Sequence, residues 1–513
     1  MKKLAAVLAT VLAAGALQAG RPVAKWDVIP YQRVNGVFKA GVVAFHEKPV
    51  TVTFKVDGKS VHTATKPELN PRTKVWEFVL PLDTSKYKDG ELKLGATASV
   101  DGEDAYELPE IVLYANSGKT VGSRKIAWVD PKNGNEFDLG DKEHPVKTIR
   151  QGIKKAGDGG YVLLLPGDYQ AKLAGGGMER KYWTTVMPAP GVKRSQVKIE
   201  GGRTGTDKLK FFNVEFFCDC DDGYDAIVMG EGGGSCAWFD NCRFTNKKGR
   251  YGGYTTVFGN KLKAYVTGGV TEEMSNGPCC EFVRGHTVRN IACDAFSCNN
   301  ALVINSSVDG IDATGTGNDP DVFNGFSTGK NWTDDVILYN VKATDVKAKG
   351  LAGQRLRNCA FVNVVIENSG DGLIYSRFSE EMENVLFAHL TLVGQKWQWM
   401  QTKNGRGDFK PTDVKLINCV FEAMEGFETG DGSAGLAVKN SAFYKKDFYG
   451  KTETFGTDAV VVERPFADEG AKNFALPEGS AGLTAGMELQ SVPVDVNGVE
   501  YPAGQRPCGA YAK

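Results

Sequence analysis

The first pattern along the chain is a succession of short segments in which apolar and polar residues alternate. Over residues 26–116 these segments include VTVTFKVDG, KVWEFVLPL and ELKLGATASV, separated by Gly, Pro and Asp. Side chains of a strand point alternately to its two faces, so this alternation predicts strands with one buried face. Their number and spacing predict a small Ig-like β-sandwich over residues 26–116. It shows no catalytic constellation, and we expect a rigid spacer or, alternatively, a carbohydrate-binding module.

A different pattern recurs in the rest of the chain, where an Asn is followed by residues that alternate between apolar and polar. Copies from Asn340 onward lie about 22 to 29 residues apart, the length of one coil of a β-solenoid. Because each coil stacks on the next, Asn side chains at one position can form a hydrogen-bonded ladder. His389 fits the same position in a further copy. The copies begin at Asn213, Asn241, Asn290, Asn340, Asn363, Asn418 and Asn440.

The segment before these repeats, residues 128–170, contains a strand, a loop, a short amphipathic helix and a second strand. It includes HPVKTI and LLLPGDY, with Ile149 and Ile153 four residues apart. It resembles the opening of the pectate-lyase-like superfamily of right-handed parallel β-helices. The Gly- and Pro-rich end of the chain resembles the closing segment of that superfamily, so the resemblance covers residues 128–511. It implies an all-β chain in which a right-handed parallel β-helix over residues 126–513 follows the β-sandwich.

The amino-terminal end predicts the location of the protein, and the charge balance bears on its partners. Met-Lys-Lys precedes an apolar run followed by small residues, which predicts a secretory signal peptide over residues 1–19. The run is too short to span a bilayer, and no later segment is long enough without charges, so we expect a secreted or periplasmic monomer without a membrane span. With 61 Lys+Arg against 62 Asp+Glu the net charge is −1, which gives no support to nucleic-acid binding.

The chain has 11 cysteines, and in an exported protein some of them are expected to form disulfides. The odd number leaves at least one thiol unpaired within the chain. The pairs at 218–220 and 279–280 lack the partner pairs that a structural zinc site would need. Cys242 and Cys419 directly follow a repeated Asn, where we expect them to serve as buried apolar filling.

Three carboxylates interrupt the repeats in the segment DATGTGNDPDVFNGFS, residues 312–327. Asp312, Asp319 and Asp321 lie among Gly and other small residues. Carboxylates that repel one another are a poor choice for solubility alone. A coil needs few residues to turn, so this Gly-rich excursion is extra length that stacking does not explain.

Basic residues follow these acids at the spacing of the coils. One period beyond Asp321 come Lys347 and Lys349, and a further period brings Asp371 and Arg377. Because strands of successive coils lie about 4.8 Å apart, we expect these groups on one outer wall of the β-helix. Two interpretations stay open: a solvated face with salt bridges, and a site beside a groove for a polymer.

Calcium is the cofactor that the acidic residues suggest, because it takes several oxygen ligands from carboxylates and carbonyls. The acids of residues 312–321 are one candidate site. A second acidic cluster, CDCDDGYD, competes with it, although a solvated turn between coils is the alternative there. Its candidate ligands are Asp219, Asp221 and Asp225.

The resemblance implies a polysaccharide enzyme, and short motifs help to choose the reaction. Of the pectin-hydrolase pattern only an Asp-Asp pair is present, at 334–335, and GHT at 285–287 departs from the expected Gly-His-Gly. A Gly-x-Ser-x-Gly esterase elbow is absent from the sequence. A lyase is less demanding, since a base removes the C5 proton of a uronic acid after positive charge neutralises the adjacent carboxylate. The candidate catalytic residues are Lys347, Lys349 and Arg377.

Two tryptophans give an independent indication of a sugar site. Trp397 and Trp399 lie two apart among polar residues, so on a strand their rings face the same side, as a stacking platform requires. Core packing is the alternative. Together with Asp371 they are the candidate substrate-binding residues. We therefore expect a secreted polysaccharide lyase that acts on a uronic-acid polymer by β-elimination, and the alternative is a non-catalytic glycan-binding or cell-surface β-helix protein.

Overall fold

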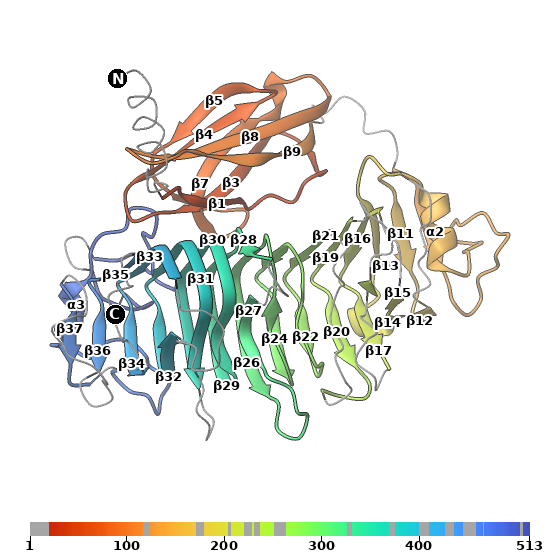
Figure 1. Ribbon diagram of the computed structural model, residues 1–513. Coiled ribbons are helices and arrows are strands. Elements are labelled where there is room, and N and C mark those ends of the chain that lie inside the picture. The colour runs from red at the N-terminus through yellow and green to blue at the C-terminus, as the bar shows by residue number, and fades with distance from the viewer. Residues whose placement is uncertain are drawn as a thin grey trace, which may run out of the picture.

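The computed structural model is nearly all β, and Figure 1 shows a long stack of parallel strands with a smaller group of strands along one side. The predicted signal peptide lies outside the residues that it describes. Within those residues, no helix is both long and apolar enough to cross a membrane. The structure describes residues 20–115, 124–170, 179–203, 207–219, 228–229, 236–250, 263–325, 331–368, 375–399, 410–425, 435–444, 458–464, 466–502 and 506–512.

The amino-terminal strands form two sheets that share one apolar core. Val42 and Phe78 from the first sheet pack in the same core as Phe54 and Leu94 from the second. The Ig-like topology and the boundary at residue 116 stay predictions. The first sheet runs in the order β1 (Val23–Trp26), β3 (Val37–Phe45), β7 (Val75–Asp83), β6 (Glu68–Asn70), and the second in the order β2 (Arg33–Val34), β9 (Tyr106–Ala115), β8 (Gly90–Val100), β4 (Val50–Val56), β5 (Lys59–Ala64), with a short 3-10 turn at Thr84–Lys86.

The remaining strands pair in parallel from coil to coil and form a β-helix. Its first part contains β10 (Ile126–Val129), α2 (Ile149–Ala156), β11 (Tyr161–Leu164), β12 (Gly167–Gln170), β13 (Thr184–Pro188), a 3-10 turn (Arg194–Gln196), β14 (Val197–Glu200), β15 (Gly202–Arg203), β16 (Asp207–Phe212), β17 (Glu215–Cys218), β18 (Val228–Met229), β19 (Cys236–Asp240), β20 (Arg243–Asn246), β21 (Lys263–Thr267), β22 (Val270–Glu272), β23 (Phe282–Arg284), β24 (Thr287–Ile291) and β25 (Phe296–Ser297). The second part contains β26 (Leu302–Asp312), β27 (Asp321–Gly325), β28 (Thr333–Asp334), β29 (Ile337–Lys347), β30 (Lys349–Asn368), β31 (Tyr375–Ala388), β32 (Thr391–Trp399), β33 (Lys410–Ile417), β34 (Val420–Glu425), β35 (Leu436–Lys439), β36 (Ala442–Tyr444), β37 (Val460–Val462) and α3 (Gly482–Ala485). The parallel β-helix is thus present, whereas its right hand and its superfamily stay predictions.

Helix α2 covers the first coil, as its sequence predicts. The Thr148 side chain accepts a hydrogen bond from the Gln151 N–H, and Gln151 in turn accepts one from the Thr148 N–H, which closes a capping box. Ile149 and Ile153 are buried against the end of the β-helix. Gly152 allows the close approach, because a Cβ there would lie 2.5 Å from Val129.

The repeated Asn lies at a turn between two strands of a coil, where the backbone takes a positive φ. This φ is 54° at Asn340, 51° at Asn363 and 53° at His389. Asn tolerates this left-handed conformation better than most residues, because its short polar side chain can hydrogen-bond locally. The turn therefore selects Asn, and the stacking of coils then brings the side chains together.

The predicted ladder of side chains is confirmed along this turn. Asn340 donates to Asn305 at 3.0 Å and Asn363 donates to Asn340 at 2.9 Å. Asn418 donates to the Nε2 atom of His389 at 3.0 Å. The assignment of Asn290 to this ladder was wrong, because it stacks between Glu273 and Gly310 at a second turn whose residues also have positive φ.

Cysteines behave as small apolar side chains in this fold. Cys242 and Cys419 are buried in the core of the β-helix, as predicted. No disulfide joins two of the described cysteines, so the expected disulfides are not found there. Burial raises the pKa of Cys242 and Cys419 to about 12, so both thiols stay protonated near neutral pH.

The amino-terminal sheets and the closing tail both pack on one side of the β-helix. The rings of Phe45 and Tyr339 lie 4.9 Å apart, and Arg284 forms an ion pair with the buried Asp27. From the tail, the Val494 carbonyl accepts from Asn363 at 2.8 Å. The loop between β26 and β27 projects from the β-helix on the side away from the amino-terminal sheets (Figure 1).

Candidate functional site

The predicted acidic segment forms the loop that joins β26 to β27. The register of the parallel strands sets Asp312 opposite Lys347 and Asp321 opposite Lys349 of the next coil. Asn318 ties the loop to the preceding coil through a bond of 3.3 Å to the Ala292 carbonyl. We call the following group the loop wall: Asp294, Asp312, Asp319, Asp321, Lys347 and Lys349.

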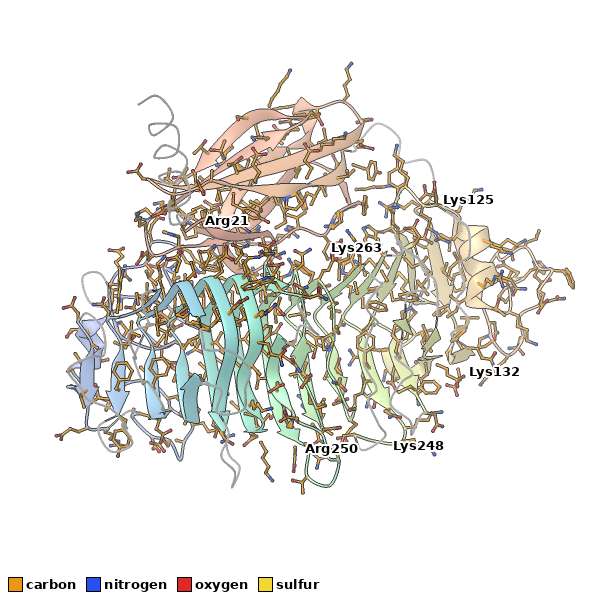
Figure 2. The ribbon with its side chains drawn as sticks, viewed as in Figure 1. Arg21, Lys125, Lys132, Lys248, Arg250 and Lys263 are labelled. Carbon is orange, nitrogen blue, oxygen red and sulfur yellow. The ribbon has the colours of Figure 1, made fainter. Side chains whose placement is uncertain are left out.

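The outer part of the loop wall is an ion-pair cluster around Asp312. The Lys347 Nζ lies 3.4 Å and the Arg250 Nη2 lies 3.7 Å from the Asp312 Oδ2. Hydrogen bonds from Thr314, followed by the contact with Lys347, hold the pKa of Asp312 below its usual value against the effect of burial. Figure 2 labels Arg250 beside the projecting loop, on the side of the β-helix away from the amino-terminal sheets.

The inner part is centred on Lys349, which contacts two carboxylates. Its Nζ forms an ion pair with Asp319 and lies 3.9 Å from the Asp321 Oδ1. The Asp319 side chain is 71% exposed, that of Lys349 8% and that of Asp321 0%. We expected all three on the outer surface, and for Asp321 and Lys349 this was wrong, because both side chains are buried. The ion pair therefore leads from the surface into the interior.

Asp294 is a member of the loop wall that sequence reasoning missed. Its Oδ1 accepts a hydrogen bond of 3.1 Å from the Asp321 N–H, and its Oδ2 accepts from Ser297 at 2.9 Å and from Asn324 at 2.7 Å. Burial raises the pKa of the Asp294 carboxyl above its usual value, against the effect of these hydrogen bonds. The available signal was its spacing, since Asp294 lies one coil before Asp321.

A column of ionisable groups is buried at this place in the solenoid, which costs free energy. Asp294, Asp321 and Lys349 are each less than a tenth exposed and belong to three successive coils. Neighbouring positions hold apolar residues such as Phe323 and Leu351, which stack in the core. Burying charged groups costs free energy that stacking alone would avoid. Ionisable groups arranged in this way are candidates for a functional site.

The donor set of the loop wall does not fit the predicted calcium site. Asp312 is paired with Lys347 and Arg250, and Asp319 and Asp321 both face Lys349. Among the described residues, three or more His, Cys, Asp or Glu side chains nowhere gather as a metal site would require.

The second acidic cluster is described only in part. The Asp219 side chain is 45% exposed and lies 3.9 Å from the Lys248 Nζ. Asp221 and Asp225 lie outside the described residues. Calcium binding at this cluster stays a prediction.

The other predicted site residues follow the loop wall along the coils. Arg377 pairs through its backbone with Ala352, three residues beyond Lys349. Trp397 and Trp399 pair with the residues on either side of Arg377, so the three backbone positions adjoin one another on successive coils. The roles of these side chains stay predictions, and Asp371 lies outside the described residues.

Comparison with known proteins gives no family for this chain. No family model matches it, and no curated protein matches it. The solved structures to which it is similar include the complex structure of XylC with xylose, at 8% identity and a TM-score of 0.47 over 75% of this chain and 98% of the other. They also include a rhamnogalacturonan lyase (12%, TM-score 0.26, covering 62% and 87%) and the Agl-KA catalytic domain (12%, TM-score 0.28, covering 82% and 90%). At these TM-scores the likenesses carry no argument about function.

Proposed function

We propose that this protein is an exported polysaccharide lyase that acts on a uronic-acid polymer by β-elimination at the loop wall. The observation that carries the proposal is the buried ion-pair column that reaches the surface at Asp319, the exposed partner of the buried Lys349. Lysines next to an exposed, replaceable carboxylate provide a place for the carboxylate of a uronic acid. A polymer lying along the coils would extend from there toward Arg377 and the two tryptophans.

The proposed reaction needs a neutralising cation and a base. In this proposal the uronate carboxylate takes the place of Asp319 beside Lys349, which balances its charge and makes the C5 proton more acidic. A base then removes that proton, a C4–C5 double bond forms, and the C4–O bond breaks so that the leaving oxygen takes up a proton. The two candidates for the base are Lys347, which is 47% exposed, and Arg377 on the following coil.

A non-catalytic glycan-binding protein is the second candidate, and one observation favours it. Both lysines of the loop wall already contact carboxylates, Lys347 that of Asp312 and Lys349 those of Asp319 and Asp321. A base must be free to accept a proton. Residues held in ion pairs are well suited to binding an acidic chain by exchange of partners.

Ultraviolet absorbance of the unsaturated product distinguishes the two candidates. The protein is incubated with polygalacturonate, alginate and hyaluronan, each with and without a chelator so that a requirement for calcium is also tested. Loss of about 10²–10⁴-fold in rate is expected when the true base is replaced, in Lys347→Ala or Arg377→Ala. Lys263→Ala is the matched control, because this exposed lysine lies on the side of the amino-terminal sheets (Figure 2).

Lys349 needs a paired variant, because removing it alone leaves the buried Asp321 carboxylate uncompensated. Asp321→Asn/Lys349→Met removes both charges, and its melting temperature shows whether the fold survives. A folded double variant without activity supports the proposal. If the wild-type protein binds a polymer but forms no product, the lyase hypothesis is wrong and the glycan-binding hypothesis is supported. Neither binding nor product with any acidic polymer would overturn both.

A further inference from the structure

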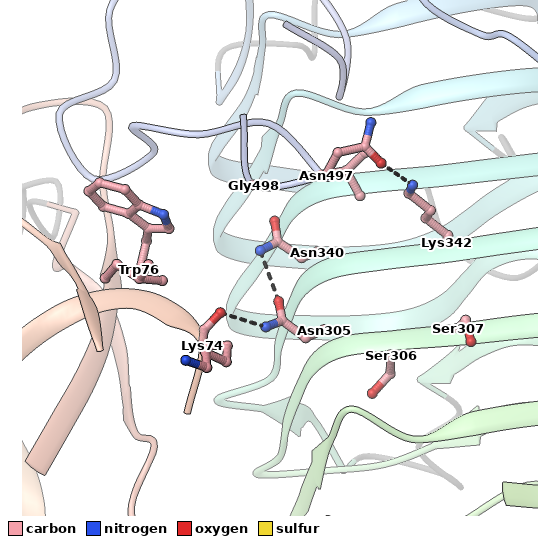
Figure 3. A pocket seen from close by; sticks show the side chains of 11 residues that line it. Lys74, Trp76, Asn305, Ser306, Ser307, Asn340, Lys342, Asn497 and Gly498 are labelled. Atoms are coloured by element: carbon pink, nitrogen blue, oxygen red, sulfur yellow. Dashed lines mark hydrogen bonds between the residues drawn. The ribbon is translucent and has the colours of Figure 1, made fainter. Parts of the chain in front are cut away.

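A cleft of about 500 Å³ lies between the amino-terminal sheets and the β-helix, on the side away from the loop wall. Three distant segments line it: strands β6 and β7 with the turn between them, the turns of two coils, and the closing tail. Figure 3 shows Trp76 and Lys74 on one side and Asn497, Gly498 and Lys342 across from them. Its volume lies within the ~300–1,000 Å³ range of pockets for small ligands.

One wall of the cleft is apolar and aromatic. Leu69 and Trp76 are directly paired across β6 and β7, so their side chains lie on the same face of the sheet. Leu69 is 46% exposed and Trp76 is half-buried, so both contribute apolar surface to the cleft. An exposed apolar patch rimmed by polar groups indicates a binding site. An indole beside an aliphatic side chain is the platform on which the C–H face of a sugar ring packs.

The opposite wall is polar and is held in place by the Asn ladder. Asn305 donates to the Lys74 carbonyl at 3.2 Å and Asn340 donates to Asn305 at 3.0 Å (Figure 3). Each uses one N–H in these bonds, and an amide nitrogen carries two. Ser307 and Asn497 add a hydroxyl and a second side-chain amide. Such groups match the hydroxyls of a saccharide.

The charge of the cleft selects for an anion. Among the described residues that line it, Lys74 and Lys342 are basic and none is acidic. The Lys342 Nζ donates to the Asn497 side chain, which orients it across the cleft. Gly498 has a φ of +79° and no atom within 4 Å of where a Cβ would lie, so the space beside this lining residue is open.

We propose that this cleft is a second saccharide site, which binds a short acidic oligosaccharide with a sugar ring on Trp76 and a carboxylate at Lys74 or Lys342. The choice of a uronic acid rests on the proposed function, whereas the cleft itself does not depend on any reaction. The site holds a polymer at a distance from the loop wall, which raises the effective concentration of further segments there.

Calorimetric titration with trigalacturonic acid tests the cleft by itself. The titration uses the full chain carrying Asp321→Asn/Lys349→Met, so that binding at the loop wall is removed. Trp76→Ala is expected to weaken the remaining binding about tenfold, and Trp76→Phe, which keeps an aromatic ring, to weaken it less. Lys342→Met is expected to weaken binding and to lessen its dependence on salt. Trp332→Ala, a half-buried tryptophan outside the cleft, is the control and is expected to leave the affinity unchanged.

The outcomes separate this inference from the proposed function. Unchanged affinity in both Trp76→Ala and Lys342→Met would overturn the second site, whatever the loop wall does. Equal affinity for neutral maltotriose would also overturn it, since the lysines would then select nothing. If no assay detects product but Trp76→Ala still weakens binding, the saccharide site in the cleft is supported and the lyase hypothesis is wrong.

Discussion

The replacement His389→Asn should remove a defined part of the acid sensitivity of the fold. His389 occupies the Asn ladder, where neighbouring coils hold Asn363 and Asn418, so Asn fits the space and the positive φ. The His389 Nδ1 faces the Gly509 carbonyl at 3.0 Å and the Nε2 accepts from Asn418 at 3.0 Å. This arrangement assigns the proton to Nδ1 and requires a neutral ring, because a second proton on Nε2 would face the Asn418 amide.

The expected magnitude follows from the pKa. Burial, with a smaller effect from Arg506, lowers the pKa of His389 from 6.5 to about 4. A depressed folded-state pKa means that stability is present above the unfolded pKa and is lost as the pH falls from 6.5 toward 4. This loss is about 2 kcal/mol by pH 5 and about 3 kcal/mol below pH 4. His389→Asn lacks this loss, although at pH 7.5 it should be less stable by about 1 kcal/mol for the missing bond to Gly509.

Equilibrium urea denaturation of both proteins at pH 7.5 and pH 5 measures the effect. The difference in free energy of unfolding should shift by about 2 kcal/mol in favour of the variant between the two pH values. Taking the difference cancels the contributions of His46 and His286, whose pKa values burial also lowers to about 4. His144→Asn, at a side chain 62% exposed, is the matched control for the substitution itself. A difference independent of pH for His389→Asn would refute the reasoning.

Three further predictions test the fold. Asn363→Ala should destabilise the protein by about 3 kcal/mol, because it leaves buried partners unsatisfied at a positive φ, while Asn363→Gly should cost about 1 kcal/mol less in the same denaturation experiment. Arg284→Ala should lower stability by about 3 kcal/mol by leaving the Asp27 carboxylate buried without its ion pair, and Asp27→Asn/Arg284→Met should recover part of this loss. In thiol labelling at pH 8 read by mass spectrometry, Cys242 and Cys419 should stay unmodified in the native protein and react after unfolding; modification in the native state would contradict their burial.

The fold was largely predictable because the coils of a solenoid repeat the same backbone turn. The turn of positive φ selects Asn, and that residue recurs at Asn340 and Asn363. The position of Asn290 in the sequence could not show at which turn it lies, because a second turn of the coil also has a positive φ and also accepts Asn. Coils in which Gly268 and Gly285 take the turn were missed, because Gly also adopts positive φ and leaves no recognisable repeat.

The sequence predicted which residues of the loop wall are neighbours, but not which of their side chains are buried. Spacing along the chain places Asp321 beside Lys349, since a residue one coil later is a neighbour in space. It does not say which side chains a loop covers, so the burial of Asp321 and of Asp294 required the structure. The cleft at Trp76 is formed by three segments far apart in sequence, and no periodicity relates them.

A crystal structure with trigalacturonic acid bound tests the central claim most directly. If the loop wall is the site, a sugar carboxylate lies within hydrogen-bonding distance of Lys349 or Lys347, and Asp319 has moved away from the Lys349 Nζ. Sugar bound only elsewhere, with the pairs of Lys349 to Asp319 and of Lys347 to Asp312 intact, would contradict it.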